Sequence, residues 1–272
     1  MRFSGACTLI ALLLTGCPRQ RDKALTSEEA RAATEEAALA SKAEGLTASV
    51  VELTTSFTIG EAVEAAAEEL RDFIESQLPC AEVTLEDATL EVEYGVNDGN
   101  CTYRGHTFSG ISRVTVTRND DARVTVDHEW EALSNGLVEL DGTAQVTWDF
   151  ENETRRVVHE TLWSDLDTGR TAEGEGDRTQ SLLDGGLLEG IRVDGMRSWT
   201  GQAGRWDLAI DGVELRWVDP VPQAGSYTLA TPFEKSMTLS FDRVDEDTIR
   251  VTVESGARSF EFNVTSRGVT ER

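Results

Sequence analysis

From Glu82 to the C-terminus, apolar and polar residues alternate in short runs, and turn-forming residues separate one run from the next. The stretch 90–94, for example, has the sequence Leu-Glu-Val-Glu-Tyr. Side chains of a strand point alternately to its two faces, so this period of two predicts strands with one buried and one exposed face. The connections are too short for the crossovers that parallel strands require, so neighbouring strands must be antiparallel.

We therefore expect a meander of about ten to twelve antiparallel strands that curves into a half-barrel or an open barrel-like sheet. Besides 90–94, the strand segments are 114–116, 124–126, 144–150, 157–163, 237–241, 249–253 and 260–264. The residues Asn97–Asn100 predict a hairpin turn, after which Cys101–Tyr103 would return as a strand. The segment 219–225 holds two prolines and is the clearest interruption. The residues after it form either a small terminal sheet or the last strands of the same sheet.

Three segments combine alternation with an Asp-Gly pair and a later Trp, namely 138–148, 191–199 and 208–217. Each Asp-Gly pair predicts either a hairpin turn or a β-bulge that bends its strand. The spacing of the three segments is irregular, which argues against a propeller or a solenoid.

Two helices are expected before the strands. Thr26 and Glu29 have the spacing of a capping box, and a run rich in Ala and Glu follows, which predicts a helix over about 26–44. An apolar stripe at helical spacing predicts a second helix over about 60–78. Residues 45–57 fit helix or coil. The predicted fold is α+β and predominantly antiparallel β, with a helical segment at 26–79 and a β domain at 80–272.

The first residues of the chain have a different pattern. Arg2 precedes an apolar run, Ala6–Leu14, whose nine residues are too few to span a bilayer. The run ends in Leu14-Thr15-Gly16-Cys17, which resembles the lipobox of bacterial lipoprotein signal peptides. The resemblance implies removal of residues 1–16 as a signal peptide and lipidation of Cys17. The alternative is an ordinary secretory signal with a chance Cys.

Lipidation of Cys17 would place the protein in the bacterial cell envelope, anchored to a membrane. Residues 17–25 form a short tether with three cations, which would lie at the anionic lipid surface unless they are only linker residues. Pro18 follows the Cys, whereas the best-known inner-membrane retention signal of this class has Asp there. This difference favours the outer membrane over the inner membrane.

The lipobox also accounts for two of the four cysteines, because Cys7 lies in the signal segment and Cys17 would carry the lipid. Cys80 and Cys101 remain, and an even pair in an oxidising compartment predicts a disulfide. It would close a loop of about 20 residues, which the chain-entropy model values at roughly 3 kcal/mol. The alternative is two reduced thiols.

The chain is strongly acidic, with 50 Asp and Glu against 25 Lys and Arg and a net charge of −25. Nucleic-acid binding requires clusters of cations that displace counterions from phosphates, so the charge excludes this class of partner. The chain also lacks the motifs of Ser hydrolases, zinc proteases, nucleotide-binding loops and dinucleotide-binding folds. We therefore expect a non-catalytic protein without a cofactor.

Three histidines, His106, His128 and His159, are the possible metal ligands of highest interest. Alternation places His128 on the opposite face from its acidic neighbours, and His159 shares a face with apolar residues. If the strand through Val146 lies between them, their backbones are about 9.6 Å apart, too far to share a metal without a third ligand. Structural histidines are the favoured interpretation.

Asp165 and Asp167 belong to a stretch that matches part of a calcium loop, but the fifth-position carboxylate and the closing Glu are missing. They are weak metal candidates, and a hairpin turn explains the same residues. The six tryptophans lie in or beside strands, where core positions are favoured over an exposed platform for sugars. They are Trp130, Trp148, Trp163, Trp199, Trp206 and Trp217.

Three functions stay open from the sequence. The leading hypothesis is a non-catalytic envelope lipoprotein that binds or scaffolds another envelope protein, a glycan or a lipid. The second is a carrier or chaperone of a lipid or other apolar ligand, held between the concave face of the sheet and the helix 61–78. The third is a hydrolase of unknown type. An apolar cavity of several hundred Å³ would favour the carrier.

Overall fold

The computed structural model of the chain describes residues 23–54, 63–103, 105–186, 189–216, 218–266 and 268–271. These residues form two helices, α1 (Ser27–Leu53) and α2 (Val63–Gln77), and then strands. The strands are β1 (Glu82–Glu86), β2 (Thr89–Tyr94), β3 (Thr102–Tyr103), β4 (His106–Thr107), β5 (Ser109–Asn119), β6 (Arg123–Ser134), β7 (Val138–Asp149), β8 (Thr154–Asp165), β9 (Thr171–Leu182), β10 (Gly190–Gly201), β11 (Gly204–Arg216), β12 (Ala224–Thr231), β13 (Lys235–Arg243), β14 (Ile249–Ser255), β15 (Arg258–Thr265) and β16 (Gly268–Glu271).

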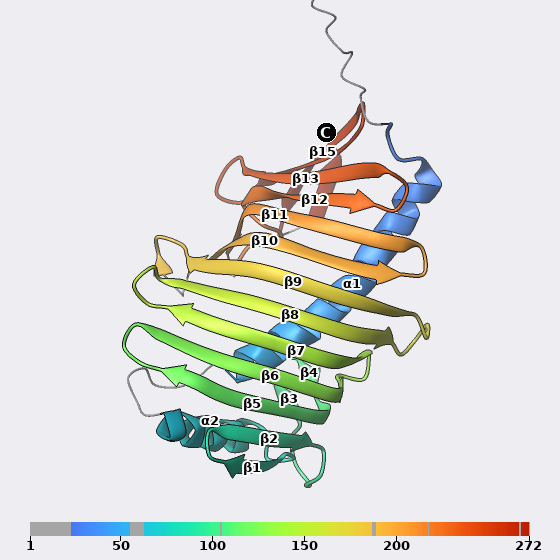
Figure 1. Ribbon diagram of the computed structural model, residues 1–272. Coiled ribbons are helices and arrows are strands. Elements are labelled where there is room, and N and C mark those ends of the chain that lie inside the picture. The colour runs from blue at the N-terminus through green and yellow to red at the C-terminus, as the bar shows by residue number, and fades with distance from the viewer. Residues whose placement is uncertain are drawn as a thin grey trace, which may run out of the picture.

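Fourteen of these strands form one antiparallel sheet that keeps the order of the chain, with β1 and β16 at its two edges (Figure 1). The small hairpin β3–β4 is separate from it. The predicted fold class is confirmed: the chain is α+β, predominantly antiparallel, and the sheet is open. Figure 1 also shows the last strands lying behind β12 and β13, on the same side as α1, so the sheet curls toward the helix at this end.

The sheet has more strands than the ten to twelve expected. The difference arises in strands whose alternation is weak. In β9, for example, Ala172 and Leu182 are the only apolar residues larger than glycine, so the period of two is hard to detect. The hairpin expected at Asn97–Asn100 is also wrong as a pairing, because β2 pairs with β5 while Thr102–Tyr103 pairs with β4.

Two of the three Asp-Gly pairs lie opposite β-bulges and are not hairpin turns. Asp141 faces a bulge in β6 and accepts a hydrogen bond from the backbone N–H of Ala132 at 2.9 Å. Asp194 faces a bulge in β11 and accepts a hydrogen bond from the backbone N–H of Gly212 at 2.7 Å. The bulge at Ala132 presses against β5, where a Cβ on Gly110 would lie 2.1 Å from the Ala132 carbonyl oxygen. Bulges of this kind bend strands and help the sheet to curve.

Helix α1 crosses the concave face of the sheet diagonally (Figure 1). Near its start, Glu29 binds Lys235 Nζ of β13 at 2.6 Å, and just after its end Thr54 Oγ1 lies 2.8 Å from Nε2 of His128 on β6. The predicted capping box of Thr26 and Glu29 is present. The helix extends well beyond 44, because its C-terminal part carries the large side chains that the sheet buries. These are Leu46, Val50, Val51 and Leu53.

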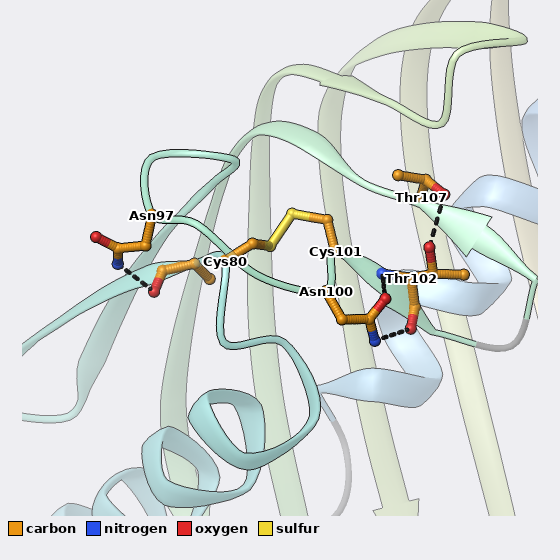
Figure 2. The surroundings of a disulfide bond; sticks show 7 residues. Cys80, Asn97, Asn100, Cys101, Thr102 and Thr107 are labelled. Carbon is orange, nitrogen blue, oxygen red and sulfur yellow. Dashed lines mark hydrogen bonds between the residues drawn. A yellow bond between two sulfur atoms is a disulfide. The ribbon is translucent and has the colours of Figure 1, made fainter.

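Helix α2 packs against β1, β2 and β5 at one end of the sheet, where Leu70 and Ile74 are fully buried. Directly after it, Cys80 forms the predicted disulfide with Cys101, which ties the end of the helix to the segment before β3 (Figure 2). Asn97 donates a hydrogen bond to the carbonyl oxygen of Ala81 at 3.0 Å beside this bond.

The sheet continues without interruption past 219–225. Strand β11 ends before this segment and β12 begins within it. The two strands pair with each other from Asp207 opposite Ala230 to Glu214 opposite Ala224. The strands after 219 are therefore part of the same sheet. They have a small apolar cluster of their own around Phe241, whereas the main core lies beneath α1 and α2.

Replacing both Cys80 and Cys101 with Ala tests how much the disulfide contributes. We expect the free energy of unfolding to fall by about 3 kcal/mol, because the cross-link restricts the unfolded chain over a loop of this length. Urea unfolding followed by circular dichroism measures the difference. An unchanged midpoint would mean that the remaining packing already holds this end of the sheet.

Candidate ligand groove

Beside α1, part of the concave face is uncovered and forms a groove of about 670 Å³ between the helix and strands β9–β13. Small residues of α1 form one wall: Thr34, Ala37, Ser41, Gly45 and Ala48. Mostly apolar residues of the sheet form the floor, among them Ile191, Val193, Ile210, Leu215, Tyr227 and Leu239. The groove therefore combines an apolar floor with a helix that does not fill it.

The sequence builds this wall through helical spacing. Thr34, Ala37, Ser41, Gly45 and Ala48 recur every three or four residues, which places them along one side of α1. None of them has a side chain long enough to cover the floor. The floor itself comes from the inward-facing positions of neighbouring strands, which the register aligns, so the groove is a direct result of the alternation of each strand.

Next to the groove, aromatic residues fill the core, and one of them, Trp199, also lines the groove. The rings of Trp199 and Trp206 stack with centroids 6.2 Å apart, and Trp206 meets Phe233 edge to face at 5.7 Å. Trp163 is buried beside them. The expectation that tryptophans belong to the core is confirmed for these three and for Trp130, while Trp148 is half-buried. Trp217 lies outside the described residues.

Four ionisable side chains meet where this aromatic core adjoins the groove. Glu44 of α1 lies 3.2 Å from Arg197 of β10, contacts Arg178 of β9 directly, and lies 3.6 Å from Nε2 of His159 of β8. The side chains are between 6% and 16% exposed. We call these residues the Glu44 cluster. Three of them come from consecutive strands, so the sheet brings together residues that are about twenty positions apart in the sequence.

The charges of the Glu44 cluster do not cancel. Burial acts to raise the pKa of Glu44, but the positive charges of Arg178 and Arg197 outweigh it and lower the pKa, so Glu44 is ionised. Burial lowers the pKa of His159 below its usual value, although Glu44 opposes this, so the ring is neutral at neutral pH. Two guanidinium groups then face a single carboxylate.

The structure separates the two acidic-flanked histidines as expected. Ala144 of β7 lies directly between His128 and His159, so one strand stands between them. The ring of His159 contacts Glu44 of α1, and the ring of His128 contacts Thr54, the C-cap residue of α1. His106 lies elsewhere and pairs with Asn135 at 2.8 Å. No group of three or more potential metal ligands comes together among the described residues.

Asp165 and Asp167 lie beside Lys42 of α1. The carboxylate of Asp165 is buried and accepts hydrogen bonds from Lys42 Nζ at 2.6 Å and from the backbone N–H of Thr168 at 2.8 Å. The Lys42 hydrogen bond holds the pKa of Asp165 down, at about 2. Asp167 is 3.9 Å from Lys42 Nζ and exposed. The ammonium group of Lys42 thus lies where a metal ion bound by Asp165 and Asp167 would lie. The hairpin-turn interpretation accounts for both carboxylates.

Sequence reasoning missed Glu44, Arg178 and Arg197. A signal was available for Arg178, which has the same parity in β9 as the buried Ala172 and therefore points inward. Nothing in the sequence indicated Glu44 as its partner, because that contact depends on where α1 crosses the sheet. The lipidation candidate Cys17 lies outside the described residues.

In comparisons with known proteins, the chain matches no family model, no curated protein and no solved structure. Within the described part of the chain, neither α1 nor α2 combines the length and the apolar content needed to cross a bilayer.

His128 should make the stability of the protein depend on pH. Burial lowers its pKa to about 4, whereas the unfolded chain has the ordinary value of about 6.5. The unfolded state therefore binds a proton first as the pH falls, and stability is lost between these two values. From pH 7 to pH 5 we expect a loss of about 2 kcal/mol from this residue.

The measurement is urea unfolding at both pH values for the wild type and for His128→Leu. The variant should lose about 2 kcal/mol less than the wild type over this interval. Equal losses in the two proteins would show that His128 is not buried in its neutral form.

Proposed function

We propose that this protein is a lipid-anchored lipoprotein of the bacterial envelope that binds an elongated apolar ligand in the groove beside α1. The observation that carries the proposal is the groove itself, whose volume of about 670 Å³ falls in the range of small-molecule sites. Its floor is apolar, and its size is what the carrier hypothesis required. The proposal thus joins the envelope location expected from Leu14–Cys17 to the carrier hypothesis.

The physical argument rests on the free energy of apolar surface in water. Ile191, Leu215, Tyr227 and Leu239 line the groove and are only half-buried, although they face the concave side of the sheet. Removing such surface from water is favourable, by about 25 cal/mol for each Å². A contiguous concave apolar surface of this kind is typical of a binding site. A few larger apolar residues on α1 would cover it, yet the residues of the helix that line it are small except for Glu44.

The groove lies against α1 and not against the helix 61–78 that was expected to hold a ligand. Helix α2 covers β1, β2 and β5, where the core is filled. The tether at 17–25 leads directly into α1. Nine residues extend at most about 30 Å, so anchoring at Cys17 would keep the groove close to the membrane. A lipid leaving or entering the bilayer would have a short path to it.

A hydrolase receives less support. His159 lies beside a carboxylate at the groove, which is one part of a catalytic arrangement. Its Nδ1 has no hydrogen-bond partner, however, and Nε2 faces Glu44, so neither ring nitrogen is joined to a hydroxyl or thiol among the described residues. Nucleophilic catalysis requires that contact. Binding without catalysis fits the geometry better.

Filling the groove tests the proposal. Ala48 lines it and is exposed, so Ala48→Trp should block the ligand without disturbing the core. Ala38 is also exposed on α1 but does not line the groove, so Ala38→Trp is a matched control. We expect organic extraction and mass spectrometry to find an apolar molecule with the wild type and the control, and at least about tenfold less with Ala48→Trp. Finding no such molecule with the wild type would contradict the proposal.

Anchoring has a separate test. Cys17→Ser removes the thiol that would carry the lipid, so the variant should move from the membrane fraction to the soluble fraction. Cys7→Ala changes a cysteine of the signal segment and should leave the protein with the membranes. Immunoblots of the two fractions measure this. Membrane association of Cys17→Ser equal to that of the wild type would rule out Cys17 as the anchor.

A further inference from the structure

Arg178 and Arg197 give the apolar groove a specific chemistry. Both line it, on adjacent strands, and their side chains are only 11% and 15% exposed. Each is paired with a glycine of the neighbouring strand, with Arg178 opposite Gly195 and Arg197 opposite Gly176. The ring of His159 occupies the space over Gly176, where an added Cβ would lie 2.4 Å from its Cε1, and both guanidinium groups still line the groove.

One carboxylate, Glu44, serves both arginines within the described part of the chain. With His159 neutral, the Glu44 cluster carries one uncompensated positive charge. Arg178 Nε also has no hydrogen-bond partner. A buried charge without a counter-ion and a buried donor without an acceptor are both costly, so an anion placed here would be bound strongly. Arginine is the side chain best suited to bind a carboxylate or a phosphate.

Tyr227 adds a hydroxyl group to the same site. It lines the groove, burial raises its pKa, and the charges of Arg197 and Arg178 act on it in the opposite direction. The phenol is therefore protonated at neutral pH and near enough to the arginines for their charges to be felt. A protonated phenol is a further donor for an anionic group.

We infer that the ligand is an amphiphile with one long acyl chain and an anionic acid group, which Arg178 and Arg197 bind while the chain lies on the apolar floor. This inference rests on the proposed function and names the ligand class for that groove. The protein carries a net charge of −25, so long-range attraction does not bring anions to it. Affinity must come from the acid group and the chain together.

The test compares ligands that differ only in the head group. The full-length protein, stripped of co-purified lipid, is titrated with a saturated 16-carbon fatty acid, the alkyl phosphate of the same length and the corresponding alcohol. Binding is followed by tryptophan fluorescence, since Trp199 lines the groove. We expect the acid or the phosphate to bind at least about tenfold more tightly than the alcohol, and the stronger of the two identifies the head group.

Arg197→Gln provides the test on the protein side. The change leaves Arg178 and Glu44 as a balanced pair, so no buried charge is left alone. The affinity for the acid should fall about tenfold, while that for the alcohol stays the same. Arg192→Gln is the control, because Arg192 lies on the same strand, is 45% exposed and does not line the groove. Circular dichroism shows whether each variant is folded.

The outcomes separate the two proposals. Equal binding of acid, phosphate and alcohol would overturn the role of the arginines and leave the apolar groove supported. An unchanged affinity of Arg197→Gln for the acid would also overturn it. Binding of none of the three would overturn both proposals and favour a protein segment as the occupant of the groove.

Discussion

An open sheet does not close on itself, so another element must cover its concave face to exclude water from it. Here that face is covered by α1, which lies diagonally across it, and the rest of the structure depends on this one contact. Because the helix is much narrower than the sheet, it divides the concave face into two parts. One part is filled by core side chains, and the other is the groove, which Trp199 also lines. Both the core and the candidate site are therefore consequences of the same crossing.

Polar contacts distributed along α1 hold the helix at its angle, and three of them mark its start, its middle and its end. Glu29 binds Lys235 near the start, the Glu44 cluster forms in the middle, and Thr54 contacts His128 at the end. The apolar side of an alanine-rich helix is smooth, and such a surface specifies a position on a sheet only weakly. Ion pairs and hydrogen bonds with buried partners are directional, and leaving any of them unmade is costly. They supply the precision that alanine packing lacks.

Much of the fold could be predicted because it depends on local pattern. The alternation of Leu90–Tyr94 and its successors gave the antiparallel sheet, and Thr26 with Glu29 gave the start of α1. Counting the cysteines left after assigning Cys7 and Cys17 gave the Cys80–Cys101 disulfide. Each of these signals is contained in a few neighbouring residues or in simple arithmetic.

The groove and the Glu44 cluster could not be predicted in this way. Glu44 is one of many glutamates in a helix, and its role depends on which strand lies beneath it. Strand β9 adds a second difficulty, since glycine and charged residues hide its period of two. Where α1 crosses the sheet is a long-range property, and no short stretch of sequence encodes it.

The distance along the chain between Glu29 and Lys235 has a consequence for folding. A chain emerges from its N-terminus first, so α1 is made before any strand that it will cover. The contact of Glu29 with Lys235 can form only after β13 has been made, close to the end of synthesis. Until then the N-terminal part of α1 lacks this contact, and its side chains, many of them alanine, expose little apolar surface to other molecules. An alanine-rich sequence is therefore suited to a helix that contacts a strand from the last part of its own chain.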